Sequence, residues 1–280
     1  MKRPRNYADL LKDVLTEEEL TLLPRSFDIV GNIAIVELPS QLMGRASLIG
    51  QAILNFHKNV RSVYAKIGPV SGIYRTRKLS LIAGEDNPIT IHTEYGLRFM
   101  IDVSRVYFSP RLSWEHRRVA LQVKDGEIVV DMFSGVGPFA IHIASLRKAL
   151  VYAVDINPYA YECMKESIRL NLKRFKGVVV PIKGDSRIVA YAMSGVADRV
   201  IMNLPEKALE FIPYALKLLK SSGGTIHFYA FGGSDLNEVI QKLKTAVESS
   251  RRRLEEVICV RRVREVAPRK WQIVVDALIR

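Results

Sequence analysis

The chain has 280 residues, of which 48% are hydrophobic, so it is long enough for a full core and for two domains. Its 42 Lys and Arg residues exceed its 29 Asp and Glu residues and give a net charge of +13. That balance is unusual for an enzyme of small anionic metabolites and ordinary for a protein that handles nucleic acid. A generally basic surface is the plainer alternative.

The hydropathy of the chain and its cysteine and histidine content predict where the protein is located and what it does not bind. No apolar run approaches the roughly 18 residues of a membrane span, and the charged N-terminus lacks the apolar core of a signal peptide. We therefore expect a cytoplasmic protein with no membrane contact. Cys163 and Cys259 lie far apart, and the five histidines show no metal-ligand spacing, so we predict neither a disulfide nor a metal site.

The first 125 residues predict a small domain and a connection. A helical extension is expected over residues 1–23, where Thr16 and Glu19 have the spacing of a capping box. Residues 24–108 are mainly β in pattern, with one helical stretch and a hairpin turn in "TEYGLRF", so we expect a small α+β domain. A linking helix is predicted over residues 109–125.

From residue 126 to residue 280, apolar strands alternate with helical segments, which is the pattern of a doubly wound α/β sheet. The strands are expected at residues 127–133, 150–156, 178–185, 199–205 and 225–231, with a closing pair at 254–266 and 270–279.

A glycine-broken turn, "DMFSGVGPFA", follows the first of these strands. Asp131 ends the strand, and Gly135 and Gly137 precede a helix entered through Pro138. Glycines at this spacing let a ligand approach the backbone closely, but they occur in dinucleotide enzymes as well as in other classes. Asp155 ends the next strand, where a carboxylate can accept hydrogen bonds from both ribose hydroxyls.

A third acid, Asp185, ends the third strand and is expected to accept a hydrogen bond from an adenine amino group. Asp131 beside the glycine turn would repel a pyrophosphate, so a ligand with a cationic middle fits better. S-adenosylmethionine, with its sulfonium and ammonium groups, is such a ligand. For each acid alone, a helix cap or a solvated strand end is the structural alternative.

Four segments, "FSPRLSWEHRR", "DMFSGVGPF", "AVDINP" and "IMNLPE", occur in this order. With them the chain resembles the archaeal and eukaryotic tRNA (guanine(37)-N1)-methyltransferase family, which methylates the guanosine 3′ of the anticodon. "LPRSFDIVGNIAIVELP" and "GIYRTRKLSLIAGE" also resemble that family's tRNA-contacting middle domain.

The resemblance implies a Rossmann-like class I methyltransferase domain over residues 126–280, with a mostly parallel doubly wound sheet and an antiparallel last strand. A small α+β RNA-contacting domain over residues 24–108 precedes it. S-adenosylmethionine is the implied cofactor and the anticodon stem-loop of tRNA the implied partner, and we expect a monomer.

The resemblance also implies roles for single residues. Glu115 matches the general base, Arg75 matches the arginine at the guanine oxygen, and Asn203 of Asn-Leu-Pro matches the residue that orients the base. The chemistry agrees, because guanine N1 carries a proton at neutral pH that must leave before it can attack. A guanidinium at O6 stabilises the charge that grows there as the proton leaves.

Tyr107, Arg111 and Pro205 match positions near the target nucleotide. If one helix held both Arg111 and Glu115, they would project from the same face. The residues expected to contact the cofactor are Asp131, Phe133, Gly135, Gly137, Asp155, Asp185 and Asn203.

Two departures from the family pattern stand out. Glu115 is followed by a histidine where the family usually has an arginine, so His116, Arg117 or Arg118 must supply what that arginine holds. Only 22 residues precede Leu23, so we expect a member without the extra N-terminal domain that many archaeal relatives carry.

Several alternatives remain open at this point. A wybutosine-pathway enzyme would act on the same tRNA position, either as an aminocarboxypropyl transferase or as a dual-specificity methyltransferase that also modifies a tricyclic guanosine derivative. The aminocarboxypropyl relatives tend to lack Asn-Leu-Pro, which favours methyl transfer. A non-catalytic RNA-binding protein is disfavoured because the acids and the Asn-Leu-Pro motif are all present. A Rossmann dehydrogenase is disfavoured by Asp131 and by the lack of a phosphate-binding arginine near the glycine turn. Basic runs such as "RTRK" and "VRRVREVAPRK" together fit a surface for structured RNA, although each alone is more typical of a solvated face.

Overall fold

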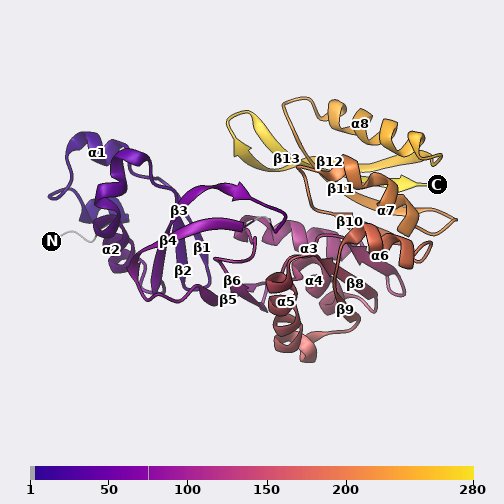
Figure 1. The fold of residues 1–280 in the computed structure, drawn as a ribbon, viewed down its shortest axis with the longest axis horizontal. Coiled ribbons are helices and arrows are strands. Elements are labelled where there is room, and N and C mark those ends of the chain that lie inside the picture. Colours follow the sequence, from indigo (N-terminus) through magenta and orange to yellow (C-terminus); the bar gives the residue numbers. More distant parts are fainter. Residues whose placement is uncertain (1–3, 75) are drawn as a thin grey trace. The chain divides into compact units, whose positions relative to one another are not determined.

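The computed structural model describes residues 4–74 and 76–280 and divides into two units, Met1–Pro110 and Arg111–Arg280 (Figure 1). Each unit has its own sheet and its own buried apolar core. Within the described residues, no helix is both long enough and apolar enough to cross a membrane.

The first unit is built on a four-stranded sheet of order β1-β2-β3-β4. Because β2 and β3 are parallel, the chain must cross over the sheet between them, and η2 (Ser40–Arg45) and α2 (Ala46–Phe56) make that crossover. Gly50 lets α2 lie close to the sheet, since a Cβ there would be 2.8 Å from the Cβ of Ala83. The strands are β1 (Asp28–Val30), β2 (Ile33–Val36), β3 (Ser62–Ser71) and β4 (Thr76–Gly84).

The residues before β1 pack into the same core as this sheet. Within the helical extension predicted here, the structure has a 3-10 turn, η1 (Tyr7–Leu10), and a five-residue helix, α1 (Glu17–Thr21). The predicted capping box is confirmed, because Thr16 Oγ1 accepts from the Glu19 N–H while the Glu19 carboxylate accepts from the Thr16 N–H. The buried side chains of this segment are Tyr7, Leu11, Leu15 and Leu23.

A separate hairpin, β5 (Ile89–Glu94) and β6 (Leu97–Asp102), completes the first unit. Tyr95 and Gly96 have φ angles of 47° and 80°, which is the left-handed backbone of a two-residue hairpin turn. The hairpin predicted from "TEYGLRF" is therefore confirmed.

The segment predicted as a linking helix is shorter than expected. It contains η3 (Pro110–Leu112) and then α3 (Ser113–Gln122), which packs against α4 (Pro138–Leu146) of the second unit. Arg111 lies in the 3-10 turn before α3, so Arg111 and Glu115 are not held by one α-helix and the condition for a shared face is not met.

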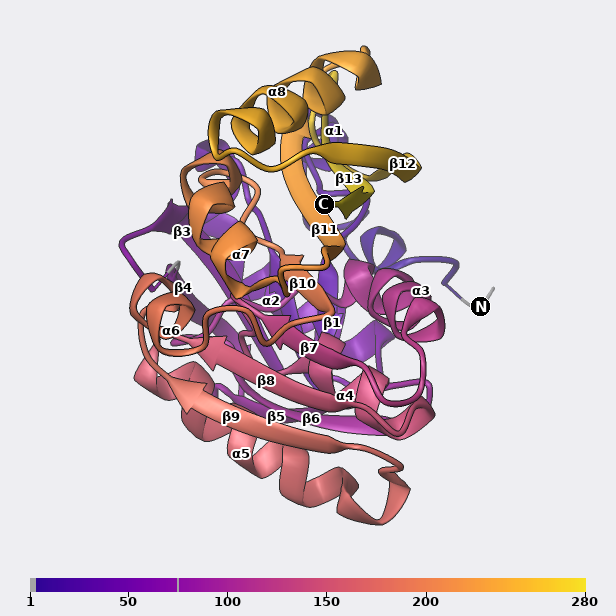
Figure 2. The same ribbon diagram turned by 90° about the vertical axis from the view of Figure 1, so that its right-hand side faces the viewer.

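The second unit is a seven-stranded sheet of order β12-β13-β11-β10-β7-β8-β9, and Figure 2 shows these strands side by side. β13 runs antiparallel to both of its neighbours, whereas the strands from β11 to β9 are parallel. The mostly parallel doubly wound sheet with an antiparallel last strand is thus confirmed. The strands are β7 (Ile128–Asp131), β8 (Leu150–Asp155), β9 (Val178–Lys183), β10 (Arg199–Met202), β11 (Gly224–Gly232), β12 (Leu254–Ala267) and β13 (Lys270–Ile279).

Helices cover both faces of this sheet, and a buried apolar cluster lies under each layer. One face packs against α3, α4 (Pro138–Leu146) and α5 (Pro158–Asn171). The other packs against α6 (Ser186–Ala192), α7 (Ile212–Leu218) and α8 (Leu236–Ser249). Two short 3-10 turns, η4 (Leu172–Arg174) and η5 (Ala208–Phe211), complete the unit.

Candidate active site

The carboxyl ends of four neighbouring strands, β10, β7, β8 and β9, place the predicted cofactor residues at one edge of the second unit's sheet. Asp131 of β7 pairs in register with Ile201 of β10 and with Ala153 of β8. Asn203 and Asp155 therefore each lie two residues beyond the level of Asp131. The chain leaves β7 toward β8 on one side and has β10 on the other, so this edge is a topological switch point, where open α/β sheets bind ligands.

The glycine turn after β7 is fastened to the end of β8. Gly135 has a φ of 56°, and its N–H donates to Asp155 Oδ2 at 2.6 Å. Gly137 has a φ of 84°, and a Cβ there would lie 3.0 Å from Met164 of α5. The second glycine thus serves left-handed backbone and close helix packing, while the first brings the loop onto Asp155.

Asp131 is the most unusual carboxylate at this edge. Its side chain is fully buried, and Oδ2 has no hydrogen-bond partner within the part of the chain that the structure describes. Burial raises the pKa of Asp131 to about 7, and the charge of Asp155 adds to that rise. A buried carboxylate with an unsatisfied oxygen favours a ligand that brings a positive charge or a hydrogen-bond donor, and S-adenosylmethionine offers both.

Asp185 is engaged differently from the other two acids. It caps α6 by accepting from the Arg187 N–H at 2.8 Å, and it pairs with the Arg187 guanidinium at 2.5 Å. The hydrogen bond from Arg187 holds the pKa of Asp185 below its usual range. The structure therefore shows the helix-cap alternative for Asp185, and its contact with an adenine stays a prediction.

Two further predicted residues line the same edge. The Phe133 ring packs edge-on against Phe211, with centroids 4.9 Å apart. Asn203 follows directly after β10, and its Oδ1 accepts from Gln272 Nε2 of β13 at 2.9 Å. Pro205 is half-buried in the loop that continues from Asn203.

Glu115, the predicted general base, is buried on α3 and held from several sides. Its carboxylate accepts from Tyr229 Oη at 2.6 Å and from Arg261 Nη2 at 2.7 Å. Arg118 adds a two-nitrogen contact with distances of 2.7 to 3.1 Å. The carboxylate is thus oriented by two guanidinium groups and one phenol.

This contact set extends into a buried polar network that the sequence did not predict. Arg118 also contacts Asp276 of β13, whose Oδ1 lies 2.6 Å from Nδ1 of His227. The other ring nitrogen of His227 lies 2.8 Å from Arg199 Nη1. Because a guanidinium can only donate, Nε2 must be the acceptor and Nδ1 must carry the proton, so His227 is neutral. The available signal was a titratable residue inside each of the apolar strands "TIHFYAF" and "WQIVVDALI".

The pKa values of this pair follow from the same geometry. Burial lowers the pKa of His227, and the two neighbouring guanidinium groups oppose its charged form further. Burial alone would raise the pKa of Asp276, but the hydrogen bonds from His227 and Arg118 hold it below its usual range. The pair is therefore an ionised aspartate against a neutral histidine.

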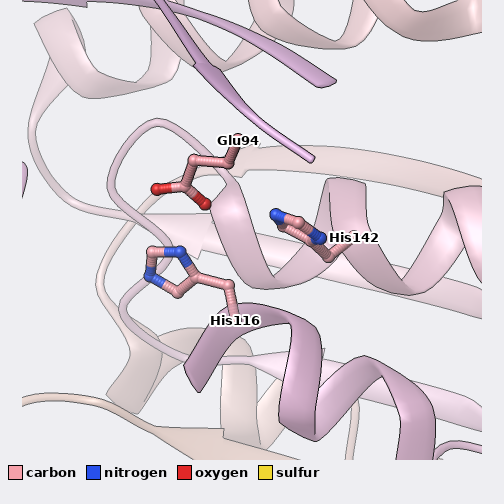
Figure 3. Close-up of side chains that lie close together, drawn as sticks. All are labelled: Glu94, His116 and His142. Carbon is pink, nitrogen blue, oxygen red and sulfur yellow. The ribbon is translucent and has the colours of Figure 1, made fainter. Parts of the chain in front are cut away.

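His116 occupies the position where the family pattern has an arginine. Its buried ring packs edge-on against Phe139, and its centroid lies 6.1 Å from that of His142 of α4. Figure 3 shows the His116 and His142 side chains near each other. Among the three residues expected to replace the missing arginine, Arg118 contacts Glu115. Sequence spacing gave no hint that His116 and His142 meet, because helix packing alone brings them together.

The remaining predicted substrate residues do not all belong to the second unit. Arg75 lies outside the described residues. Tyr107 belongs to the first unit, and Arg111 starts the second unit in η3. Their contacts with a nucleotide stay predictions.

The sheet order, the glycine turn and the acidic strand ends define a class I, Rossmann-like methyltransferase domain. Residues 90–255 match the TRM5/TYW2 methyltransferase domain, and residues 7–87 match the TYW2 N-terminal domain. The chain belongs to the TRM5/TYW2 methyltransferase family.

Two curated relatives illustrate the range of this family. The chain is 44% identical over 277 residues to tRNA (guanine(37)-N(1))-methyltransferase Trm5b of Pyrococcus abyssi, covering 98% of this chain and 80% of that protein. It is 37% identical over 254 residues to tRNA 4-demethylwyosine(37)-methyltransferase Taw21 of Saccharolobus solfataricus, covering 90% of this chain and 93% of that protein.

Solved structures agree with this assignment. A complex of aTrm5 and tRNALeu superposes with a TM-score of 0.86 at 34% identity, over 100% of this chain and 79% of that one. TYW2 of M. jannaschii in complex with AdoMet superposes with a TM-score of 0.69 at 29% identity, over 91% of this chain and 99% of that one.

Proposed function

We propose that this protein is a tRNA (guanine(37)-N1)-methyltransferase that takes its methyl group from S-adenosylmethionine. The observation that carries the proposal is the strand-end edge, where an unsatisfied buried Asp131 and the Asp155-anchored glycine turn adjoin Asn203. The 44% identity to Trm5b supports the same reaction.

The residues of the edge fit S-adenosylmethionine, which supplies an electrophilic methyl group when it is bound. Asp131 would meet a positively charged part of the cofactor, and Asp155 would accept hydrogen bonds from the ribose hydroxyls. Phe133 would supply an apolar contact. Asp185 would reach the adenine only if its pairing with Arg187 allows another hydrogen bond, which the second lone pairs of its oxygens permit.

Glu115 is the residue we assign to the N1 proton of guanine. Arg118 and Tyr229 would hold its carboxylate in place while one oxygen receives the proton. Arg261 is the partner most able to move away from Glu115 when the base binds, because its side chain is 28% exposed whereas that of Arg118 is 10% exposed. Arg75 would stabilise the negative charge that develops on O6, and Asn203 would orient the base.

We assign tRNA contacts to the small domain over residues 24–108, including Tyr107, and to Arg111 and Pro205 of the second unit. In this proposal the chain is divided into the small domain, a linking segment over residues 109–125 and the methyltransferase domain over residues 126–280. The protein would act in the cytoplasm as a monomer on the anticodon stem-loop. Size-exclusion chromatography with light scattering, with and without tRNA, tests the monomer.

The deciding experiment is incubation of the protein with S-adenosylmethionine and an anticodon stem-loop, followed by nucleoside mass spectrometry. We expect a mass increase of one methyl group on the guanosine 3′ of the anticodon, with the methyl on N1. Transfer of an aminocarboxypropyl group, or a methyl on another atom, would refute the assignment.

Methyl transfer to a tricyclic guanosine derivative is the second candidate, favoured by the 37% identity to Taw21 over 93% of that protein. The same assay with a stem-loop that carries 4-demethylwyosine separates the cases. Activity on both stem-loops would indicate dual specificity, and activity on the tricyclic base alone would replace the first assignment.

A further inference from the structure

Three side chains of the second unit form a hydrogen-bonded chain that ends at Asn203. Arg264 Nε donates to Gln272 Oε1 at 2.9 Å, and Gln272 Nε2 donates to Asn203 Oδ1 at 2.9 Å. Arg264 on β12 and Gln272 on β13 are register partners. Gln272 is 1% exposed, so water does not compete for its amide.

The direction of this chain follows from the chemistry of its first member. A glutamine or asparagine amide can turn by 180° and exchange its donor with its acceptor, so a single contact leaves its orientation open. A guanidinium has only donors, so Gln272 must turn its oxygen toward Arg264. Its NH2 group then faces Asn203, which must present its own oxygen to Gln272.

The consequence appears at the end of the chain. Gln272 fixes the sense of the Asn203 amide and occupies one lone pair of its Oδ1, so the Nδ2 group keeps its N–H donors for a ligand at the strand-end edge. Asn203 is thereby a donor toward whatever binds beside it. Guanine carries a carbonyl acceptor, O6, where adenine carries an amino donor, so a fixed donor can separate the two bases.

We propose that Gln272 and Arg264 are positioning residues that lock the Asn203 amide as a hydrogen-bond donor and so favour guanine over adenine as the target base. The inference rests on the proposed function, in which Asn203 contacts the target base. Neither Gln272 nor Arg264 touches the substrate; both act through Asn203.

The decisive variant is Gln272→Glu. Its carboxylate still accepts from Arg264 but has no donor for Asn203, so the Asn203 amide must turn and present Oδ1 to the ligand. We expect the single-turnover methyl-transfer rate on guanosine to fall by roughly 10- to 100-fold, because a donor to the base has become an acceptor. The preference for a guanosine stem-loop over an adenosine stem-loop in binding should shrink by a similar factor, roughly 10-fold or more.

Gln272→Met and Gln241→Glu are the matched variants. Gln272→Met keeps the side-chain length but removes both amide groups, which leaves Asn203 without a set orientation, so its loss should be smaller than that of Gln272→Glu. Gln241→Glu makes the same chemical change at an exposed position of α8 and should leave rate and base preference unchanged. Cofactor affinity and the thermal midpoint, measured for each variant, report on folding.

Arg264 provides a second route to the same conclusion if Gln272→Glu does not fold. Arg264→Leu frees the Gln272 amide to turn and should weaken the base preference, whereas Arg264→Lys keeps a group that only donates and should restore most of it. Equal base preference in both Arg264 variants would overturn the inference.

The outcomes separate this inference from the proposed function. An active wild-type enzyme whose Gln272→Glu variant keeps the same rate and the same base preference would overturn the inference alone. A loss equal in Gln272→Glu and Gln272→Met, with base preference unchanged, would reduce Gln272 to a packing role and also overturn it. A wild-type protein without methyl transfer to guanosine would remove the proposed function and the inference together.

Discussion

Two regions of the methyltransferase domain, the cofactor edge and the Glu115 cluster, are built in opposite ways. The cofactor edge comes from short loops that directly follow strands, and the Gly135–Asp155 contact joins residues only 20 positions apart. The Glu115 cluster joins α3 to β11 and β12 across sequence separations of 114 and 146 residues. Local motifs therefore describe the first region, whereas only the assembled sheet can produce the second.

The difference extends to how charge is handled. At the cofactor edge Asp131 is buried with an unsatisfied oxygen, which is a cost that a ligand can relieve. In the Glu115 cluster each buried carboxylate is matched by guanidinium or imidazole donors. The buried carboxylate of the first region lacks a partner for one oxygen, whereas those of the second are paired with cationic or imidazole groups.

The largest expected effect comes from Glu115→Gln. The amide keeps the shape of the side chain but cannot take the N1 proton, so the methyl-transfer step should slow by roughly 10²–10⁴ with tRNA and cofactor affinities nearly intact. Single-turnover rates at saturating tRNA measure this step. If the single-turnover rate of the variant were within a few-fold of that of wild type, the role of the Glu115 cluster would be structural only. Its contrast with the cofactor edge would then be sharper.

Asp276→Ala tests whether the Glu115 cluster stabilises the fold. It leaves Arg118 without one of its two carboxylates and His227 without its acceptor, so the free energy of unfolding should fall by about 3–5 kcal/mol. Chemical denaturation measures the change. The control is Glu238→Ala, which removes an exposed pair with Lys242 and should cost about 0.3–0.5 kcal/mol. Equal costs for the two variants would contradict the view of the cluster as a buried network of ion pairs.

Asp131→Asn tests the unsatisfied carboxylate. The pKa of Asp131 rises from 3.8 to about 7 on folding, so its contribution to stability is fully present below pH 4 and is lost as the pH rises through 7. An asparagine does not ionise, so at pH 8 the cofactor-free variant should be more stable than wild type by on the order of a few kcal/mol. Denaturation at pH 5 and pH 8 measures this. If the stability difference between Asp131→Asn and wild type were the same at pH 5 and pH 8, the pKa of Asp131 would not be raised by folding.

Asp155→Ala should weaken cofactor binding through the loss of one or two charge-assisted hydrogen bonds, each worth roughly 1.5–3 kcal/mol. Isothermal titration calorimetry with S-adenosylmethionine measures the change. The glycine turn also loses its acceptor for Gly135 N–H, so circular dichroism must show that the variant remains folded. If a folded variant bound S-adenosylmethionine with undiminished affinity, Asp155 would not be the residue that binds the ribose.

The sequence by itself determined the α/β sheet, the hairpin turn at Tyr95 and Gly96, and the acids at successive strand ends. Each of these depends on a short-range pattern, either a period of apolar residues or a turn that only glycine makes easily. The Asn-Leu-Pro segment after β10 was visible for the same reason, because a motif at a strand end is contiguous in the chain.

Only the tertiary structure decided which partners the functional side chains meet. That α3 starts after Arg111, that Arg118 bridges Glu115 and Asp276, and that Gln272 sets the sense of the Asn203 amide all depend on packing between distant elements. Strand register places Gln272 opposite Arg264, and sheet order places β13 between β11 and β12. Neither leaves a periodic signal in the chain, because hydrogen bonding between side chains depends on three-dimensional proximity and not on sequence spacing.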